Sequence, residues 1–144
     1  MGEVVVLVFE AVITQVVDGN KLVLPTGFIE GCRGGVAPYM LVLKDPKVSQ
    51  LRLIPVTSPK AYRVKVFIPE EDVVENANRM ARVIQENKSA LLHTPGLIPV
   101  GDKKQVLWEG YFNPSDIDRV VGLLRRELSP GVEILEEEIT LVQP

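Results

Sequence analysis

Few residues of this chain carry side chains suited to acid–base or nucleophilic chemistry. His93 is the only histidine among 144 residues, so a histidine metal cluster is excluded and a Ser–His or Cys–His pair would have to use it. A lone histidine in a strand-like segment is more often structural. Cys32 is the only cysteine; the adjacent Arg33 is the kind of neighbour that activates a thiol, but the chain offers no second cysteine as a redox partner. We therefore expect no catalytic residue.

Two further segments resemble ligand sites in composition alone. The run Glu136 to Glu138 is acidic, but successive side chains of a strand point to opposite faces, so the three carboxylates cannot converge on one metal ion. A solvated edge strand, kept from pairing by its charge, is the expected structure. The glycine-rich segment 31–35 is not followed by the lysine and serine or threonine of a phosphate-binding loop. We expect no metal, no cofactor and no enzymatic activity.

The net charge of −3 is distributed without a basic arm. Residues 1–58 contain five basic and five acidic side chains, and the remainder contains eleven and fourteen. Charge alone would therefore not hold nucleic acid. The single cysteine favours a reducing compartment, and the apolar run from Val4 to Phe9 lacks the features of a signal peptide. We expect a cytoplasmic protein that makes no membrane contact.

The first third of the chain has the pattern of two β hairpins. Residues 4–17 are rich in β-branched side chains, 18–20 form an Asp-Gly-Asn turn, and a second strand over 21–24 ends at Pro25. Segments 39–43 and 50–56 predict a second hairpin. The polar segment 57–60 contains a proline, so we place a domain boundary there, with one domain at 1–57 and another at 61–144.

After this boundary the pattern alternates between strands and helices. Apolar spacing predicts the order β, α, β, β, α, β, with Asn113 as the cap of the second helix and Pro95-Gly96 interrupting the second strand. This order is that of a ferredoxin-like sandwich, in which two helices pack on one face of a four-stranded antiparallel sheet. The expected fold class is α+β: an N-terminal all-β hairpin barrel and a C-terminal βαββαβ sandwich.

The segment from Val16 to Pro25, reading Val-Val-Asp-Gly-Asn-Lys-Leu-Val-Leu-Pro, resembles the signature of the AbrB-type (SpoVT-AbrB-like) swapped-hairpin DNA-binding domain. Lys21 stands where that family usually has arginine, and the second hairpin, ending at Val56, resembles the closing strand of that family. The resemblance implies a homodimer in which two chains interleave their hairpins into one barrel. It also implies that basic residues of the hairpins contact double-stranded DNA: Lys21 and Arg33 first, then Lys44, Lys47 and Arg52.

The C-terminal part resembles ACT-like ligand-sensing domains in element order, which implies oligomerisation or binding of a small effector. The loop after its first strand, Ile68 to Glu71, lacks the glycine that amino-acid-binding ACT domains usually place there. Two alternatives remain for the whole chain: an assembly module that does not bind nucleic acid, and a small-molecule-binding protein. An RNA-recognition domain would use stacking aromatics, for which the candidates are Phe67, Trp108, Tyr111 and Phe112, but segment 104–112 does not match its motif.

Overall fold

The computed structural model describes residues 9–30 and 37–142 of the chain. The chain divides into two compact units, Met1–Ala37 and Pro38–Pro144, and each unit is described by itself. Within the described residues no helix is long and apolar enough to cross a membrane.

The first unit contains one short hairpin. Strands β1 (Val16–Val17) and β2 (Lys21–Leu22) pair antiparallel around a turn in which Asp18 and Gly19 adopt φ values of 53° and 76°. This left-handed backbone explains the Asp-Gly sequence of the turn. The strand predicted for 4–17 is wrong for residues 9–15, which form no strand, while residues 4–8 lie outside the described part. A two-stranded hairpin without a third strand or a packed face is at best marginally stable in water, which is consistent with strands as short as β1 and β2.

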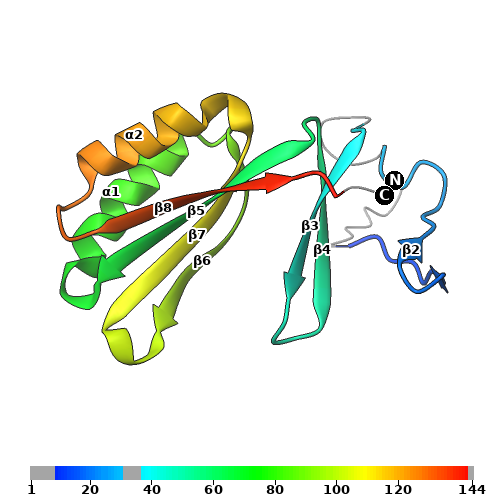
Figure 1. Ribbon diagram of the computed structural model, residues 1–144, viewed down its shortest axis with the longest axis horizontal. Helices are drawn as coiled ribbons and strands as arrows, with labels where there is room; N and C mark the ends of the chain where they lie inside the picture. The colour runs from blue at the N-terminus through cyan, green and yellow to red at the C-terminus, as the bar shows by residue number, and fades with distance from the viewer. Residues whose placement is uncertain (1–8, 31–36, 143–144) are drawn as a thin grey trace, which may run out of the picture. The chain divides into compact units, whose positions relative to one another are not determined.

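The second unit is built around a four-stranded antiparallel sheet of order β6-β7-β5-β8. Both helices lie on the same face of this sheet (Figure 1). The chain order β5-α1-β6-β7-α2-β8 is the βαββαβ order predicted from the sequence. The bounds are β5 Lys60–Pro69, α1 Val73–Glu86, β6 Leu91–Val100, β7 Gln105–Phe112, α2 Ile117–Glu127 and β8 Glu133–Thr140, with short 3-10 turns at Glu70–Asp72, Gly101–Lys103 and Pro114–Asp116.

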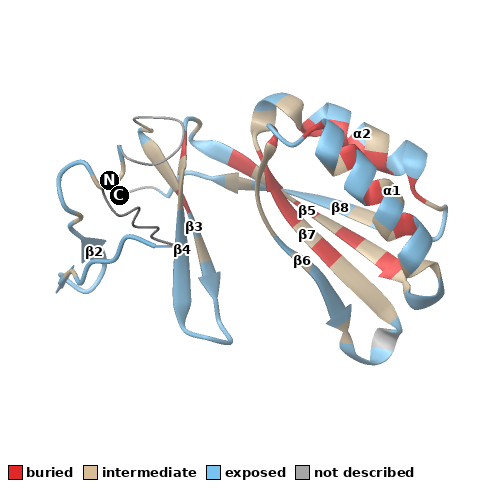
Figure 2. Cartoon of the chain, turned by 180° about the vertical axis from the view of Figure 1, so that it is seen from behind, coloured by how far each residue is buried: buried red, intermediate tan, exposed pale blue. Residues whose placement is uncertain are grey.

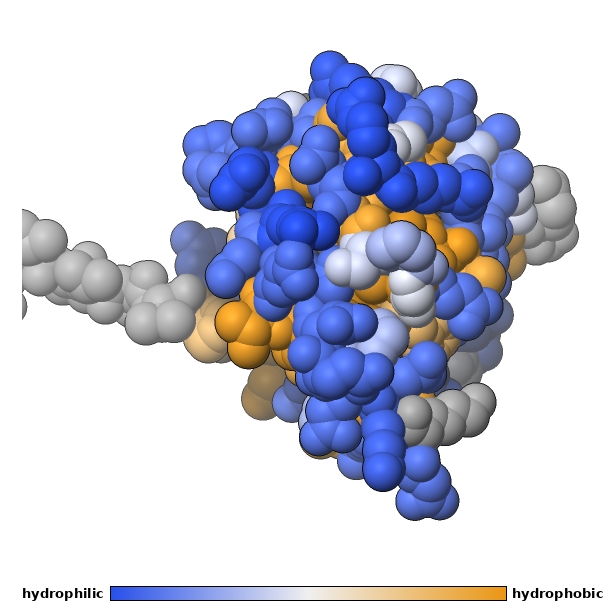
Figure 3. Space-filling model, turned by 90° about the vertical axis from the view of Figure 1, so that its left-hand side faces the viewer, coloured by the Kyte–Doolittle hydropathy of each residue, from blue (hydrophilic) through white to orange (hydrophobic). Residues whose placement is uncertain are grey.

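The main core lies between the sheet and the two helices. Val64, Val66 and Ile68 alternate along β5 and are fully buried on the helix side, as the sequence alternation predicts. Figure 2 shows the buried residues concentrated where helices and strands face one another. Figure 3 shows the surface at the left-hand side of Figure 1, where the helix and sheet layers end. This surface is mostly hydrophilic, with apolar side chains visible between polar ones.

Two local predictions differ from the structure. Pro95 and Gly96 do not end a strand: β6 runs continuously through register shifts there, and Gly96 takes a φ of 89°. Asn113 does not cap the second helix, because a 3-10 turn intervenes before α2 begins. Its side-chain amide instead donates to the Ser89 carbonyl oxygen at 3.4 Å.

The second hairpin belongs to the same unit as the large sheet. Strands β3 (Tyr39–Asp45) and β4 (Gln50–Val56) pair antiparallel, and Leu41 and Val56 are buried in a small cluster with Ala61 and Tyr111. The boundary predicted at 57–60 therefore falls inside the second unit. The α+β class is confirmed. A swapped-hairpin barrel stays a prediction, since β1–β2 and β3–β4 form separate two-stranded sheets.

Candidate nucleic-acid interface

Lys21 lies on β2, directly after the hairpin turn. Its side chain is 68% exposed, and its Nζ is 3.8 Å from Asp18 Oδ2. Exposed ion pairs of this kind contribute little free energy. Lys21 is therefore able to exchange its carboxylate partner for a phosphate at small cost. Arg33, the other first-rank candidate, lies outside the described residues.

Besides Lys21, the first unit exposes several apolar side chains. Ile13 is fully exposed, Phe9 is 83% exposed, and Val16 and Val23 are more than half exposed. Removing apolar surface from water contributes about 25 cal/mol per Å², so this unit gains stability from any chain that covers it. Such a surface is typical of a hairpin that pairs with another chain.

The three cations of the second hairpin do not share one face. In the β3–β4 register Leu43 is opposite Arg52, whereas Lys44 is opposite Leu51. Because neighbouring residues of a strand alternate between faces, Arg52 lies on the face of buried Leu41 and Lys44 on the other face. Lys47 is in the turn, where its backbone N–H donates to Asp45 Oδ1 at 3.0 Å. The structure thus brings Lys44 and Lys47 to one end of the hairpin, with Arg52 turned away from Lys44.

Arg63 is the cation with the most side-chain partners among the described residues, and it was not predicted from the sequence. It lies on β5, on the sheet face opposite the helices, with its Nη1 2.9 Å from Glu137 Oε2 and its Nε donating to the Tyr111 hydroxyl at 3.2 Å. Tyr111 in turn donates to Glu109 Oε2 at 3.0 Å. Although burial opposes its charge, these hydrogen bonds raise the pKa of Arg63. The Nε and Nη1 groups of the guanidinium are thus paired with Tyr111, Glu109 and Glu137. The cross-strand register, which the sequence does not reveal, assembles this cluster.

His93 lies beside this cluster, on β6. Its ring stacks on Tyr111 at a centroid distance of 6.4 Å. Burial, and secondly the charge of Arg52, lower the pKa of His93 below 6.5. The His93 ring is therefore packed against an aromatic neighbour.

The acidic run of β8 and the aromatic residues are the remaining candidates from the sequence. Glu137 binds Arg63, whereas Glu138 binds Lys60 at 3.1 Å, so the acidic run is divided between cations. In the described part of the chain, no three His, Cys, Asp or Glu side chains converge as a metal site. Trp108 and Phe112 are buried beneath the helices, which removes them as stacking platforms for RNA.

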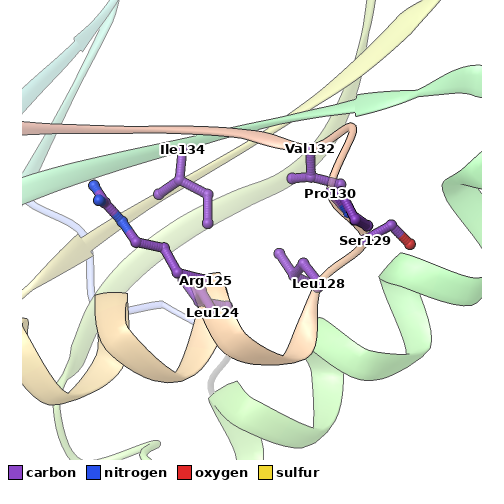
Figure 4. Close-up of a pocket in the computed structure, with 7 residues that line it drawn as sticks. All are labelled: Leu124, Arg125, Leu128, Ser129, Pro130, Val132 and Ile134. Atoms are coloured by element: carbon purple, nitrogen blue, oxygen red, sulfur yellow. The ribbon is translucent and has the colours of Figure 1, made fainter.

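One groove of about 250 Å³ lies between the end of α2 and the start of β8 (Figure 4). Leu124, Leu128 and Ile134 form its apolar part, and Arg125 and Ser129 supply polar groups. None of the residues that line the groove belongs to the loop after β5, Ile68 to Glu71, where the resemblance to ACT-like domains places an effector.

Comparison with known proteins gives limited similarity. No family model matches the chain, and no curated protein matches it. Among solved structures, it is similar to an uncharacterized Thermotoga maritima protein, TM1266, at 12% identity and a TM-score of 0.43, over 56% of this chain and 99% of that one. It is also similar to the de novo designed protein Foldit4, at 15% identity and a TM-score of 0.44, over 56% of this chain and 96% of that one. The C-terminal domain of MgtC from Mycobacterium tuberculosis follows, at 17% identity and a TM-score of 0.38, over 58% and 92%.

Proposed function

We propose that this chain is a homodimeric, AbrB-like transcription regulator that binds double-stranded DNA through its N-terminal hairpins. A C-terminal ferredoxin-like, ACT-like domain adds oligomerisation or effector sensing. The observation that carries the proposal is the first unit, which combines Lys21, exposed after the hairpin turn, with exposed apolar side chains at Phe9, Ile13 and Val23.

The apolar surface supports the dimer. A hairpin of this size cannot bury its own side chains, and a second copy of the same hairpin offers a matching apolar face. Pairing two copies places two Lys21 side chains in one assembly. A symmetric dimer also matches the two-fold symmetry of a palindromic DNA site.

The cations support a modest, salt-sensitive contact. Lys21, Lys44 and Lys47 are exposed, and Lys44 and Lys47 gather at one end of their hairpin. Each phosphate neutralised releases about 0.9 of a counterion from B-DNA. A dimer using three to five of these cations would lose affinity with salt at a logarithmic slope of about −3 to −5.

A second candidate is an assembly module that does not bind nucleic acid. Its support is the charge of the first unit, in which Lys21 and Arg33 are outnumbered by Glu3, Glu10, Asp18 and Glu30. A third candidate, small-molecule binding, is supported by the groove at Arg125 and Ser129. A cationic group above an apolar floor suits a small carboxylate with a short apolar chain.

Duplex binding decides between the first two candidates. Fluorescence anisotropy of a labelled mixed-sequence duplex should rise with protein concentration at low salt, with the shallow slope given above. A single-stranded DNA and a duplex RNA of equal length serve as controls. Absence of any duplex binding at low salt would favour the assembly module.

A further inference from the structure

The sheet of the second unit has one face that the helices do not cover. On this open face, cross-strand register aligns Ile98, Leu107, Phe67 and Glu133 in one row. The adjacent row contains Gly96, Glu109, Lys65 and Leu135. We call these two rows the open patch.

The open patch is apolar at its centre. Leu135 is 47% exposed and Ile98 is 37% exposed, while Phe67 and Leu107 between them are half-buried. None of these four side chains belongs to either core cluster of the described chain. Side chains of neighbouring strands in one row are about 5 Å apart, so Ile98, Leu107 and Phe67 form one continuous row, and Leu135 is the diagonal neighbour of Phe67 in the adjacent row.

The β3–β4 hairpin does not cover the open patch. Its buried residues contact Ala61, Tyr111 and Ile139, which lie towards the other end of the sheet. Figure 1 shows the hairpin leaving the sheet at that end and diverging from it. The patch therefore remains open at the end of the sheet where β5 terminates.

Two opposite charges flank the apolar centre without partners of their own. Among the described residues, neither Lys65 nor Glu133 forms an ion pair. Lys65 has Glu109 as its cross-strand neighbour, but that carboxylate is already occupied by Arg63 at 3.6 Å and by the Tyr111 hydroxyl. Lys65 and Glu133 lie in adjacent rows on either side of Phe67 and Leu135.

We propose that the open patch binds the open patch of a second copy of this chain about a two-fold axis. A two-fold interface is self-complementary: where one residue of the first copy contacts a second residue of the other copy, the reverse contact is also made. Phe67 and Leu135 pack against the same residues of the second copy, and Lys65 pairs with Glu133 of the second copy in both directions. The inference deepens the oligomerisation part of the proposed function, but it does not depend on the N-terminal hairpins or on DNA.

A mixing experiment on the full-length chain tests this interface. Lys65→Glu and Glu133→Lys each place like charges across it twice, so each variant alone should associate at least about tenfold more weakly through this face. Mixing the two variants restores both ion pairs, so the equimolar mixture should recover the mass of the wild type. Sedimentation velocity at micromolar concentration measures all four samples. A rearrangement within one chain cannot produce recovery on mixing.

Leu135→Asp provides the second variant, because Leu135 is exposed and outside the core. If the hairpins also dimerise and join a different pair of chains, the wild type is a tetramer, Leu135→Asp is a dimer, and Ile13→Asp is a different dimer. If both interfaces join the same two chains, the wild type is a dimer and only the combination of Leu135→Asp with Ile13→Asp is a monomer. If the hairpins do not dimerise, the wild type is a dimer, Ile13→Asp leaves it unchanged, and Leu135→Asp makes it a monomer. Unchanged mass when Leu135→Asp is added to Ile13→Asp, or no recovery on mixing charge variants that have each lost mass, would overturn the proposed interface.

Discussion

The backbone N–H of Ser129 donates a 2.9 Å hydrogen bond to Asn76 Oδ1, which joins the segment after α2 to the first turns of α1. Asn76 is fully buried, and its Nδ2 donates to the Asp72 carbonyl oxygen at 2.9 Å. Both halves of the amide are therefore satisfied inside the protein. This single side chain fixes the end of one helix against the start of the other.

Replacing Asn76 should destabilise the second unit. Asn76→Leu leaves the Ser129 N–H and the Asp72 carbonyl without partners, which should lower the free energy of unfolding by about 2 to 3 kcal/mol. Urea unfolding measures the change. Asn78→Leu, at an exposed position of the same helix, is the matched control and should have little effect. Equal losses in the two variants would contradict the role assigned to Asn76.

The burial of Asn76 could not be predicted from the sequence. The spacing of Val73, Ala77, Met80, Ala81 and Ile84 predicts one apolar stripe on α1. Met80 is buried, but Ala81 is exposed and Asn76 is buried instead. The alternation of Val64, Val66 and Ile68 specified the core face of β5 because each position carries its own apolar signal. A buried polar residue carries no such signal, since one of its partners, the Ser129 N–H, comes from the distant segment after α2.

The candidate site could also be predicted only in part from the sequence. Turn residues and charge identified Lys21 and the hairpin tip at Lys44 and Lys47 from the sequence. The Arg63 cluster depends on the register that places Arg63 between Tyr111 and Glu137, and register follows from the assembled sheet. Packing of the second hairpin against Ala61 and Tyr111 was missed for the same reason, because those residues lie beyond the polar segment taken as a boundary.

This packing predicts the behaviour of two fragments. Residues 61–144 contain the whole main core and should fold alone with mixed α/β circular dichroism. Residues 38–144 should be more stable by about 2 to 4 kcal/mol, because Leu41 and Val56 are buried only in the longer fragment. Urea unfolding of both fragments measures the difference. An unfolded 61–144 fragment would mean that hairpin and sheet share one core, and equal stabilities would mean that the hairpin adds nothing.

His93 predicts a loss of stability in mild acid. Its pKa is lower in the folded chain than the ordinary 6.5, first because of burial and then because of Arg52. The unfolded chain therefore binds a proton more readily, and the free energy of unfolding falls as the pH drops below about 6.5. His93→Gln should lose less stability than the wild type between pH 7 and 5 in urea unfolding. Parallel losses in both proteins would contradict a depressed pKa. Arg52→Gln should reduce the effect only partly, because burial is the larger cause.

The position of the hairpin cations predicts unequal roles in DNA binding. Lys44 and Lys47 lie at one end of their hairpin, whereas Arg52 faces the side of Leu41. Reversing Lys44 or Lys47 to Glu should weaken duplex binding several-fold more than reversing Arg52. Fluorescence anisotropy at fixed low salt compares the three variants. A larger effect at Arg52 would place the DNA on the opposite face of the hairpin.

Charge reversal at Lys21 is the most direct test of DNA binding through the N-terminal hairpins. Lys21→Glu removes a phosphate contact and adds repulsion in both copies of the dimer, so duplex affinity at low salt should fall about tenfold or more. Lys88→Glu makes the same change in net charge at an exposed position after α1, and it should change affinity no more than about twofold. Titrations of one labelled duplex with the wild type and both variants give the comparison. We expect a selective loss of duplex affinity in Lys21→Glu. Equal losses of affinity in the two variants would contradict DNA binding through the N-terminal hairpins.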